Sequence, residues 1–343
     1  MAWNFGDILD SISAVLPQEA PALIHGDRVI TWAETTRRSN NLGRALIARG
    51  ARPGDKVAFY MRNRPEYVET MAACFKSRLV HVNINYRYKA DEVFYIFNDS
   101  DAQTVVYGSE FRDIIVELKD RLTKVATFIE VNEDGSAAPF AENYEKIVTG
   151  GDGAPLGIER SPDDLLFIYT GGTTGMPKGV MWRHNDMREA QLTTLRALGP
   201  IPETLPELVE FIAASGPGPV SMPACPLMHG TGFITAIGNM MSGGCIVTLE
   251  SPTLDAHELW TAVSRRGVNS LAIVGDAFAR PMLAALDEAP LRLNAFITDH
   301  MCGSKGESYI RKKRGERKEK REERREQRED RREKREKRRD ARE

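Results

Sequence analysis

Cysteine is scarce in this chain, and its spacing argues against two kinds of site. The 343 residues include four cysteines, Cys74, Cys225, Cys245 and Cys302. None forms a Cys-x-x-Cys pair and no His-rich spacing accompanies them, so neither a zinc motif nor a disulfide framework is indicated. Scattered thiols of this kind predict reduced, mostly buried side chains in a cytosolic protein.

Long apolar runs are missing as well. No stretch of about 18 apolar residues is present that could cross a bilayer. The first residues, Met-Ala-Trp-Asn-Phe-Gly-Asp, lack the basic region and the apolar stretch of a signal peptide. We therefore expect a cytoplasmic protein without a membrane span, and its 41% hydrophobic content suffices for a large core.

The chain has little net charge, but the two signs are unevenly distributed. The formal net charge is -2. Residues 311–343 hold 19 basic and 11 acidic side chains, a net charge of +8, which leaves -10 for the rest of the chain. The body thus has the charge of an ordinary acidic domain, so any binding of nucleic acid would rest on the basic tail alone.

Strand-like and helical segments alternate along the first half of the sequence. Compact apolar runs predict strands, and the segments between them carry helical patterns. The predicted strands are 57–61, 80–84 and 104–107, and the predicted helices are 66–76 and 91–98. This alternation predicts an α/β domain with a largely parallel sheet. We place it within residues 1–303 and treat residues 304–343 as a separate charged tail.

Local signals predict where two helices begin. Residues 22–32 predict a short hairpin, after which Thr31 or Thr35 can cap a helix. Asn185 is predicted to be the N-cap of a helix that ends near residue 198.

The segment with the clearest chemical meaning follows a predicted strand at residues 165–170. Residues 170–179 have the sequence Thr-Gly-Gly-Thr-Thr-Gly-Met-Pro-Lys-Gly. Glycines let successive N–H groups point at one anion, and hydroxyl and ammonium groups add donors and charge. The predicted phosphate-binding residues are Thr170, Gly171, Gly172, Thr173, Thr174, Gly175 and Lys178. A hairpin turn with a surface lysine is the plainer alternative. The Gly-Lys-Ser/Thr of the common P-loop is absent.

This string is similar to the signature loop of the adenylate-forming (AMP-dependent) synthetase/ligase superfamily. Residues 48–58 also resemble an early structural motif of that family, and the resemblance covers roughly residues 5–290. It implies an incomplete N-terminal lobe with mixed and parallel sheets flanked by helices. Gly171 stands where the commonest family loop has Ser or Thr, and the Gly-Gly form fits a fatty-acyl or sterol-side-chain branch of acyl-CoA synthetases.

The resemblance implies a two-step reaction. ATP and a carboxylic acid, here a fatty acid or a sterol side chain, would give an acyl-adenylate and pyrophosphate. The thiol of coenzyme A would then displace AMP to give a thioester. The first step depends on positioning and charge neutralisation, with the loop on the phosphates and Mg²⁺ assisting.

A second segment, residues 226–233, resembles the family's Pro-Leu-x-His motif. The resemblance implies that His229 and Gly232 lie at the acyl pocket. The alternative is a loop histidine next to a buried helix. Peptide-synthetase domains usually have an Asp in this segment, and none is present here, which favours a plain carboxylic acid over an amino acid.

Residues 274–278 resemble the family's next pocket-lining turn. Asp276 lies within this turn, directly after a predicted strand. It is either an acyl-pocket residue or the N-cap of the helix that runs to residue 286. Both interpretations are kept open.

The family pattern stops after about Pro290. The Tyr-Gly-x-Thr-Glu motif, the Thr-Gly-Asp motif, the arginine hinge and the C-terminal catalytic lysine are not found, so we assign no catalytic residue and no metal ligand. We expect weak or absent adenylation and no thioester formation. Two alternatives are a non-catalytic nucleotide- or acyl-binding remnant and a nucleic-acid-binding protein that acts through its tail.

The tail itself cannot form a core, because 30 of residues 311–343 are charged. Its glutamates and its basic residues recur three and four apart, which suits a solvated helix. The alternatives are a disordered tail, an arm that attracts RNA, and a frameshifted or misjoined gene product, of which the last is favoured.

Overall fold

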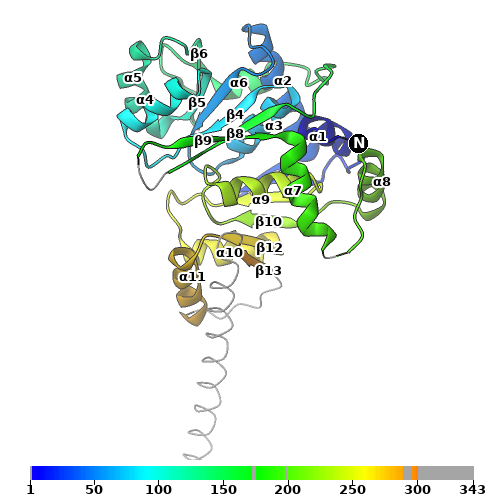
Figure 1. Cartoon of the computed structure of the whole chain (residues 1–343). Coiled ribbons are helices and arrows are strands. Elements are labelled where there is room, and N and C mark those ends of the chain that lie inside the picture. The colour runs from blue at the N-terminus through cyan, green and yellow to red at the C-terminus, as the bar shows by residue number, and fades with distance from the viewer. Residues whose placement is uncertain (1, 172–174, 198, 289–295, 300–343) are drawn as a thin grey trace, which may run out of the picture.

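The structure is a computed structural model that describes residues 2–171, 175–197, 199–288 and 296–299 (Figure 1). The predicted charged tail and Cys302 lie outside these residues. The division into residues 1–303 and 304–343 therefore stays a prediction.

The first of two sheets contains the strands predicted from the alternating pattern. Its order is β7-β6-β5-β3-β4-β8-β9, and all neighbouring pairs are parallel except β8 and β9. The strands are β3 (Lys56–Tyr60), β4 (Val80–Asn83), β5 (Ala102–Gly108), β6 (Thr127–Val131), β7 (Glu142–Asn143), β8 (Leu165–Thr170) and β9 (Lys178–Arg183). The prediction of a largely parallel α/β sheet is confirmed.

The second sheet has the order β13-β12-β10-β11-β1-β2, and only β1 and β2 are antiparallel. Its strands are β1 (Pro21–His25), β2 (Arg28–Thr31), β10 (Val220–Pro223), β11 (Cys245–Thr248), β12 (Ser270–Ile273) and β13 (Phe296–Asp299). The N-terminal hairpin β1–β2 thus joins strands that lie about 200 residues later in the chain. No sequence-local signal predicts this pairing.

Helices form three layers around the two sheets (Figure 1). Between the sheets, one core contains side chains of α1 (Phe5–Ser13), α2 (Trp32–Ala48), α3 (Pro65–Lys76) and α9 (Gly230–Met240). Outside the first sheet lie α4 (Ala90–Asp99) and α5 (Arg112–Leu118), and outside the second lie α10 (Ala256–Arg266) and α11 (Asp276–Glu288). The remaining α-helices of the described chain are α6 (Tyr144–Thr149), α7 (His184–Arg196) and α8 (Leu205–Ser215), and two short 3-10 helices cover Ser109–Phe111 and Lys119–Arg121.

The continuous apolar runs of the strands follow from this layering. Along β3, Val57 and Phe59 enter the core between the sheets, while Ala58 and Tyr60 enter the outer core under α4 and α5. Successive side chains of a strand point to opposite faces, so a sheet covered on both faces needs apolar residues at every position. Each fully buried large side chain contributes about 1.5–3 kcal/mol.

The two predicted helix starts have different outcomes. Thr31 is the N-cap of α2, and its hydroxyl accepts a hydrogen bond from the Glu34 N–H. The prediction for Asn185 is wrong, because α7 begins at His184 and Arg183 occupies the cap position. The Asn185 side-chain oxygen instead accepts the N–H of Trp3, a long-range contact that holds the N-terminal segment.

Two further expectations from the sequence were buried cysteine thiols and the absence of a membrane-spanning helix. Cys74, Cys225 and Cys245 are buried, as predicted, and burial raises the pKa of Cys245 to about 12. Within the described chain, no helix combines the length and the apolar character that a membrane span requires.

Candidate functional site

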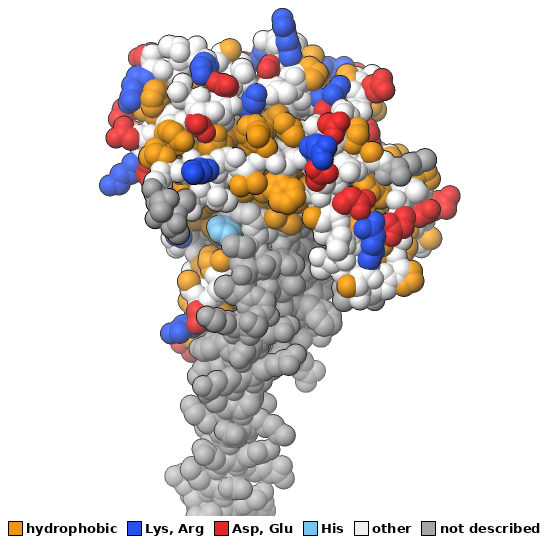
Figure 2. Space-filling view, in the orientation of Figure 1, with side chains coloured by type: hydrophobic (Ala, Val, Ile, Leu, Met, Phe, Trp, Pro, Cys, Tyr) orange, Lys and Arg blue, Asp and Glu red, His pale blue; other side chains and the backbone are white. Residues whose placement is uncertain are grey.

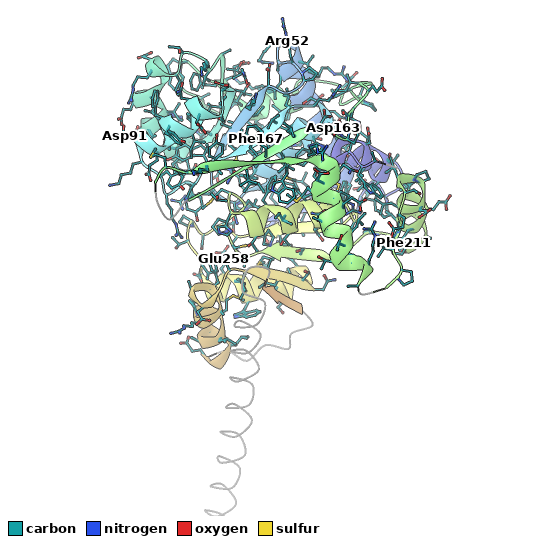
Figure 3. All side chains as sticks on the ribbon, viewed as in Figure 1. Arg52, Asp91, Asp163, Phe167, Phe211 and Glu258 are labelled. Atoms are coloured by element: carbon teal, nitrogen blue, oxygen red, sulfur yellow. The ribbon has the colours of Figure 1, made fainter. Side chains whose placement is uncertain are left out.

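The predicted phosphate loop is the turn of an antiparallel hairpin at the end of the first sheet. Strand β8 runs parallel to β4, and its last residue, Thr170, pairs with Lys178 at the start of β9. The turn therefore projects from the carboxyl ends of the parallel strands, where ligands bind in open α/β sheets. Figure 3 labels Phe167 on β8, the strand that leads into this turn.

The described residues of the turn are open to solvent. Thr170, Gly171, Gly175 and Lys178 are exposed, whereas Pro177 is buried. The other three predicted phosphate-binding residues, Gly172, Thr173 and Thr174, lie outside the described residues. Val180 and Met181 on β9 are 44% and 66% exposed, and Figure 2 shows apolar side chains gathered over β8 and β9. The phosphate-binding role of the turn stays a prediction.

Tyr169 fixes the start of the turn. Its hydroxyl donates to the Asp99 carboxylate at 2.7 Å, and burial together with this bond raises the pKa of Tyr169. Its partner across the hairpin is Gly179, where a Cβ would lie 2.9 Å from the Tyr169 ring. Gly179 is therefore needed for a close approach of β9 to this ring. The glycine-rich sequence here serves packing as well as the turn.

The predicted acyl segment lies beside this hairpin. A Cβ on Gly230, the first residue of α9, would lie 4.0 Å from a methyl group of Ile168 on β8. His229 is the N-cap of α9, and its Nδ1 accepts the N–H of Thr231 at 3.4 Å. Partial burial lowers the pKa of His229, which keeps the imidazole neutral near pH 7. The fold thus brings together two motifs that are about 50 residues apart in the sequence.

Gly232 has a clear packing role. A Cβ at this position would meet the Pro226 carbonyl oxygen at 2.3 Å, which real Cβ atoms do not tolerate. Only glycine allows the first turn of α9 to lie this close to the segment that precedes it. Its assignment to the acyl pocket stays a prediction.

Asp276 is the first residue of α11 and does not cap it. The carbonyl of Gly275 accepts the N–H of Ala279, which makes Gly275 the residue that precedes the helix. The exposed carboxylate of Asp276 pairs with Arg280 at 3.1 Å. The N-cap alternative is therefore wrong, and the acyl-pocket role stays a prediction that this outward ion pair does not favour.

A cavity of about 510 Å³ lies at the carboxyl ends of strands from both sheets. Its lining follows β3, β4, β5 and β6 of the first sheet, and β1, β10, β11 and β12 of the second. Pro226 of the acyl segment and Ala277 and Phe278 in the first turn of α11 line the same cavity. Asp276 does not belong to this lining, although its two following neighbours do.

Three arginines, Arg62, Arg64 and Arg87, and three glutamates, Glu110, Glu133 and Glu250, line the cavity. Arg62 donates to the Pro252 carbonyl, and its guanidinium lies 5.2 Å from the ring centre of Tyr86. Arg87 lies 5.9 Å from the same ring. In the described part of the chain neither guanidinium has an ion pair with a carboxylate, so both cations are available to a bound anion.

Two other basic groups of the cavity are already neutral or paired. Arg64 bonds to Glu66 at 3.0 Å, and Glu66 also accepts from Arg28 at 2.6 Å. Burial alone would raise the pKa of Glu66, but Arg64 and Arg28 lower it below its usual value. Burial lowers the pKa of His25. The unpaired positive charge of the cavity therefore comes from Arg62 and Arg87.

Sequence reasoning did not find the cavity residues. Arg62, Asn63, Tyr86 and Arg87 lie within three residues after the end of a predicted strand, and the rule that ligands bind at carboxyl ends of parallel strands could have selected them. They occur in no motif that we singled out from the sequence. Only the meeting of the two sheets gathers them around one space.

Comparison with known proteins agrees with this architecture. A family model described as "AMP-binding enzyme" matches residues 11–305. The chain belongs to the AMP-binding enzyme family. Among members of this family, the 3-oxocholest-4-en-26-oate–CoA ligase of Rhodococcus rhodochrous is 35% identical over 293 residues, which cover 84% of this chain and 52% of that protein.

A second relative in the AMP-binding enzyme family is also named as a 3-oxocholest-4-en-26-oate–CoA ligase. The medium/long-chain-fatty-acid–CoA/3-oxocholest-4-en-26-oate–CoA ligase of Mycobacterium marinum is also 35% identical, over 83% of this chain and 53% of that protein. The chain thus spans about half the length of the relatives that it matches.

Solved structures share the fold of this AMP-binding family member. The inhibitor-bound N-terminal domain of FACL13 from Mycobacterium tuberculosis has a TM-score of 0.72 at 24% identity, and the match covers 87% of this chain and 70% of that domain. A fatty acyl CoA synthetase from the same species has a TM-score of 0.70 at 23% identity, with 86% and 54% coverage. These likenesses confirm the predicted fold, and the family match assigns it to the AMP-binding enzymes.

Proposed function

We propose that this chain is the nucleotide- and acid-binding lobe of an AMP-forming acyl-CoA synthetase that activates a fatty acid or a sterol-side-chain acid. The observation that carries the proposal is the hairpin turn between Thr170 and Lys178, whose described residues other than Pro177 are exposed. It lies at the carboxyl ends of parallel strands and beside the His229 segment. Family membership and the names of the two ligases support it.

In the first step, a carboxylate oxygen of the acid attacks the α-phosphorus of ATP, and the bond to pyrophosphate breaks. The turn supplies backbone N–H groups, hydroxyls and the Lys178 ammonium to the phosphates. Its rigid base, in which Tyr169 is held by Asp99, keeps these donors in position. Rigid positioning is what an in-line displacement requires from a protein.

The acid is bound along the segment from His229 to Gly232. The neutral imidazole of His229 does not form a competing ion pair with the carboxylate, and the apolar residues of α9 continue into the core. Absence of an acidic residue in residues 226–233 agrees with an acid that has no amino group. Polar and apolar surfaces therefore meet at this point, as an acyl substrate requires.

In the second step, the thiol sulfur of coenzyme A attacks the acyl carbon, loses its proton, and displaces AMP. We assign the phosphates of coenzyme A to the cavity that contains Arg62 and Arg87. Guanidinium groups bind phosphate through paired N–H donors, and their stacking on Tyr86 holds them in place.

The described residues include no cluster of three or more His, Cys, Asp or Glu side chains suited to a metal ion. Mg²⁺ would reach the site bound to the phosphates of ATP, whose charge it would help to neutralise.

Lys178→Ala tests the proposal. We expect ATP binding, measured by isothermal titration calorimetry with MgCl₂ present, to weaken about tenfold or more, because a charge-assisted contact to phosphate is worth about 1.5–3 kcal/mol. Lys56→Ala, a lysine at the opposite end of the first sheet, is the control and should leave binding unchanged. If the wild-type chain binds no ATP, or if both variants bind equally well, the proposed function is wrong.

A further inference from the structure

Asn83 joins the two segments that carry the proposed function. It is the last residue of β4 and is 3% exposed. Its side-chain oxygen accepts the N–H of Tyr169 at 2.6 Å, and its NH₂ group donates to the Tyr169 carbonyl at 3.2 Å. The same NH₂ group donates to the Met228 carbonyl. One amide group thus contacts the residues directly before Thr170 and directly before His229.

The amide replaces backbone pairing where two strands separate. The last residue pair of the β4–β8 ladder is Val82 with Phe167, and after it the Ile84 N–H bonds to Phe59 on the other neighbouring strand. The backbone N–H and C=O of Tyr169 would otherwise be buried without partners from β4, which is costly. The position of the phosphate turn therefore depends on the Asn83 side chain, which also bonds to the acyl segment.

Asn63 provides an internal comparison. Its side-chain oxygen accepts the Leu227 N–H at 2.7 Å, and its NH₂ group donates to the Cys225 carbonyl at 3.1 Å. It holds the acyl segment from the end of β3 in the same way, but it makes no hydrogen bond to β8. Both asparagines thus bond to the acyl segment through their side-chain amides, but only Asn83 also bonds to β8.

We propose that Asn83 is a positioning residue that couples occupancy of the acyl segment to the geometry of the phosphate turn. This inference rests on the proposed function of both segments. When an acid fixes residues 226–229, the Met228 carbonyl fixes the Asn83 amide, and the amide fixes Tyr169 at the base of the turn. Binding of acid and of ATP then become linked, and the linkage is reciprocal.

The test is a binding cycle with ATP and dodecanoate as probes. We expect dodecanoate at saturation to tighten ATP binding to the wild-type chain by about fivefold or more in calorimetric titrations. Asn83→Ala should abolish this change, whereas Asn63→Ala should weaken dodecanoate but retain the change once the acid saturates. Coupling that survives in Asn83→Ala, or that is lost equally in Asn63→Ala, overturns the inference.

A measurement on the wild-type chain covers the case in which Asn83→Ala does not fold. In amide NMR spectra, dodecanoate should shift the Tyr169 backbone resonance and the Asn83 side-chain resonances. Saturation with the acid without any shift at Tyr169 overturns the inference. A wild-type chain that binds no ATP overturns the proposed function and the inference together, whereas ATP and acid that bind without linkage overturn the inference alone.

Discussion

The arginines between the sheets and those of the cavity differ in what they contact. Arg38 on α2 is almost fully buried and bonds to Glu69 at 2.7 and 3.0 Å and to Glu145 at 2.7 and 2.9 Å. The Tyr144 hydroxyl donates to the same Glu69 carboxylate. Arg62, by contrast, contacts the Pro252 carbonyl oxygen and the Tyr86 ring, and Arg87 contacts the same ring.

This difference separates structural charge from charge that can serve a ligand. Burial alone would lower the pKa of Arg38, but its bonds to Glu145 and Glu69 raise it, so the group stays charged inside the fold. All three nitrogens of the Arg38 guanidinium donate to carboxylates of the same chain. Arg62 keeps unused donors at a cavity, and an anion can supply the partners that the protein does not.

The largest expected effect is at Arg38. Arg38→Ala leaves the buried Glu69 carboxylate without its cation and should reduce the free energy of unfolding by about 3–5 kcal/mol in urea denaturation. Arg62→Ala is the matched control and should change stability by less than about 1 kcal/mol. Equal losses in both variants would remove the distinction between the two groups of arginines.

A pH titration extends the comparison to buried histidines of the inner layer. Burial lowers the pKa of His81 to about 3 and that of His184 to about 4. In the unfolded chain an imidazole takes up a proton near pH 6.5, whereas the buried imidazole stays neutral to a lower pH. The free energy of unfolding is therefore at its full value above pH 6.5 and decreases as the pH falls toward the lowered pKa values. Each histidine should cost up to about 2 kcal/mol between pH 6.5 and pH 5.

Urea denaturation at pH 7.5, 6 and 5 measures this loss, and His81→Phe gives the share of one histidine. His81 stacks on Phe233 with ring centres 4.1 Å apart, so phenylalanine keeps the aromatic contact. The variant should show a shallower dependence of stability on pH. A slope identical to that of the wild-type chain would mean that His81 does not stay neutral in the folded state.

A smaller effect is expected at the cavity. Arg62→Ala and Arg87→Ala should each weaken binding of coenzyme A about tenfold, because each removes a charge-assisted contact of about 1.5 kcal/mol. Arg52→Ala is the control, since Arg52 lies in an exposed turn at the far side of the first sheet (Figure 3). Calorimetry at low and high salt should show the effect shrinking with ionic strength. Unchanged affinity in both cavity variants would contradict the assignment of phosphates to this cavity.

The smallest effect is expected at Asp276. Its pair with Arg280 is an exposed i,i+4 contact, with side chains 47% and 67% exposed. Asp276→Ala should change the free energy of unfolding by no more than about 0.5 kcal/mol. It should also leave dodecanoate affinity unchanged. A marked loss of dodecanoate affinity would restore Asp276 to the acyl pocket.

Much of the local structure could be predicted from the sequence, because it depends on neighbouring residues. The strands at β3, β4 and β5 and the Thr31 cap follow from apolar periodicity and from side-chain hydrogen bonds within one turn. The prediction for Asn185 was wrong because its side chain makes a long-range contact and not a local one. A residue of the right type stood near a helix start, but a distant N–H, that of Trp3, used its oxygen.

The sequence by itself determined the α/β class, the presence of a glycine- and threonine-rich turn after β8, and membership of the AMP-binding family, because each of these is encoded in contiguous strings of residues. The tertiary structure alone decided which strand ends meet around the cavity, that Arg62 and Arg87 lack carboxylate partners in the described chain, and that Asn83 contacts both Tyr169 and Met228. These contacts join residues up to about 190 positions apart, and the packing of the two sheets fixes them, which no local pattern records.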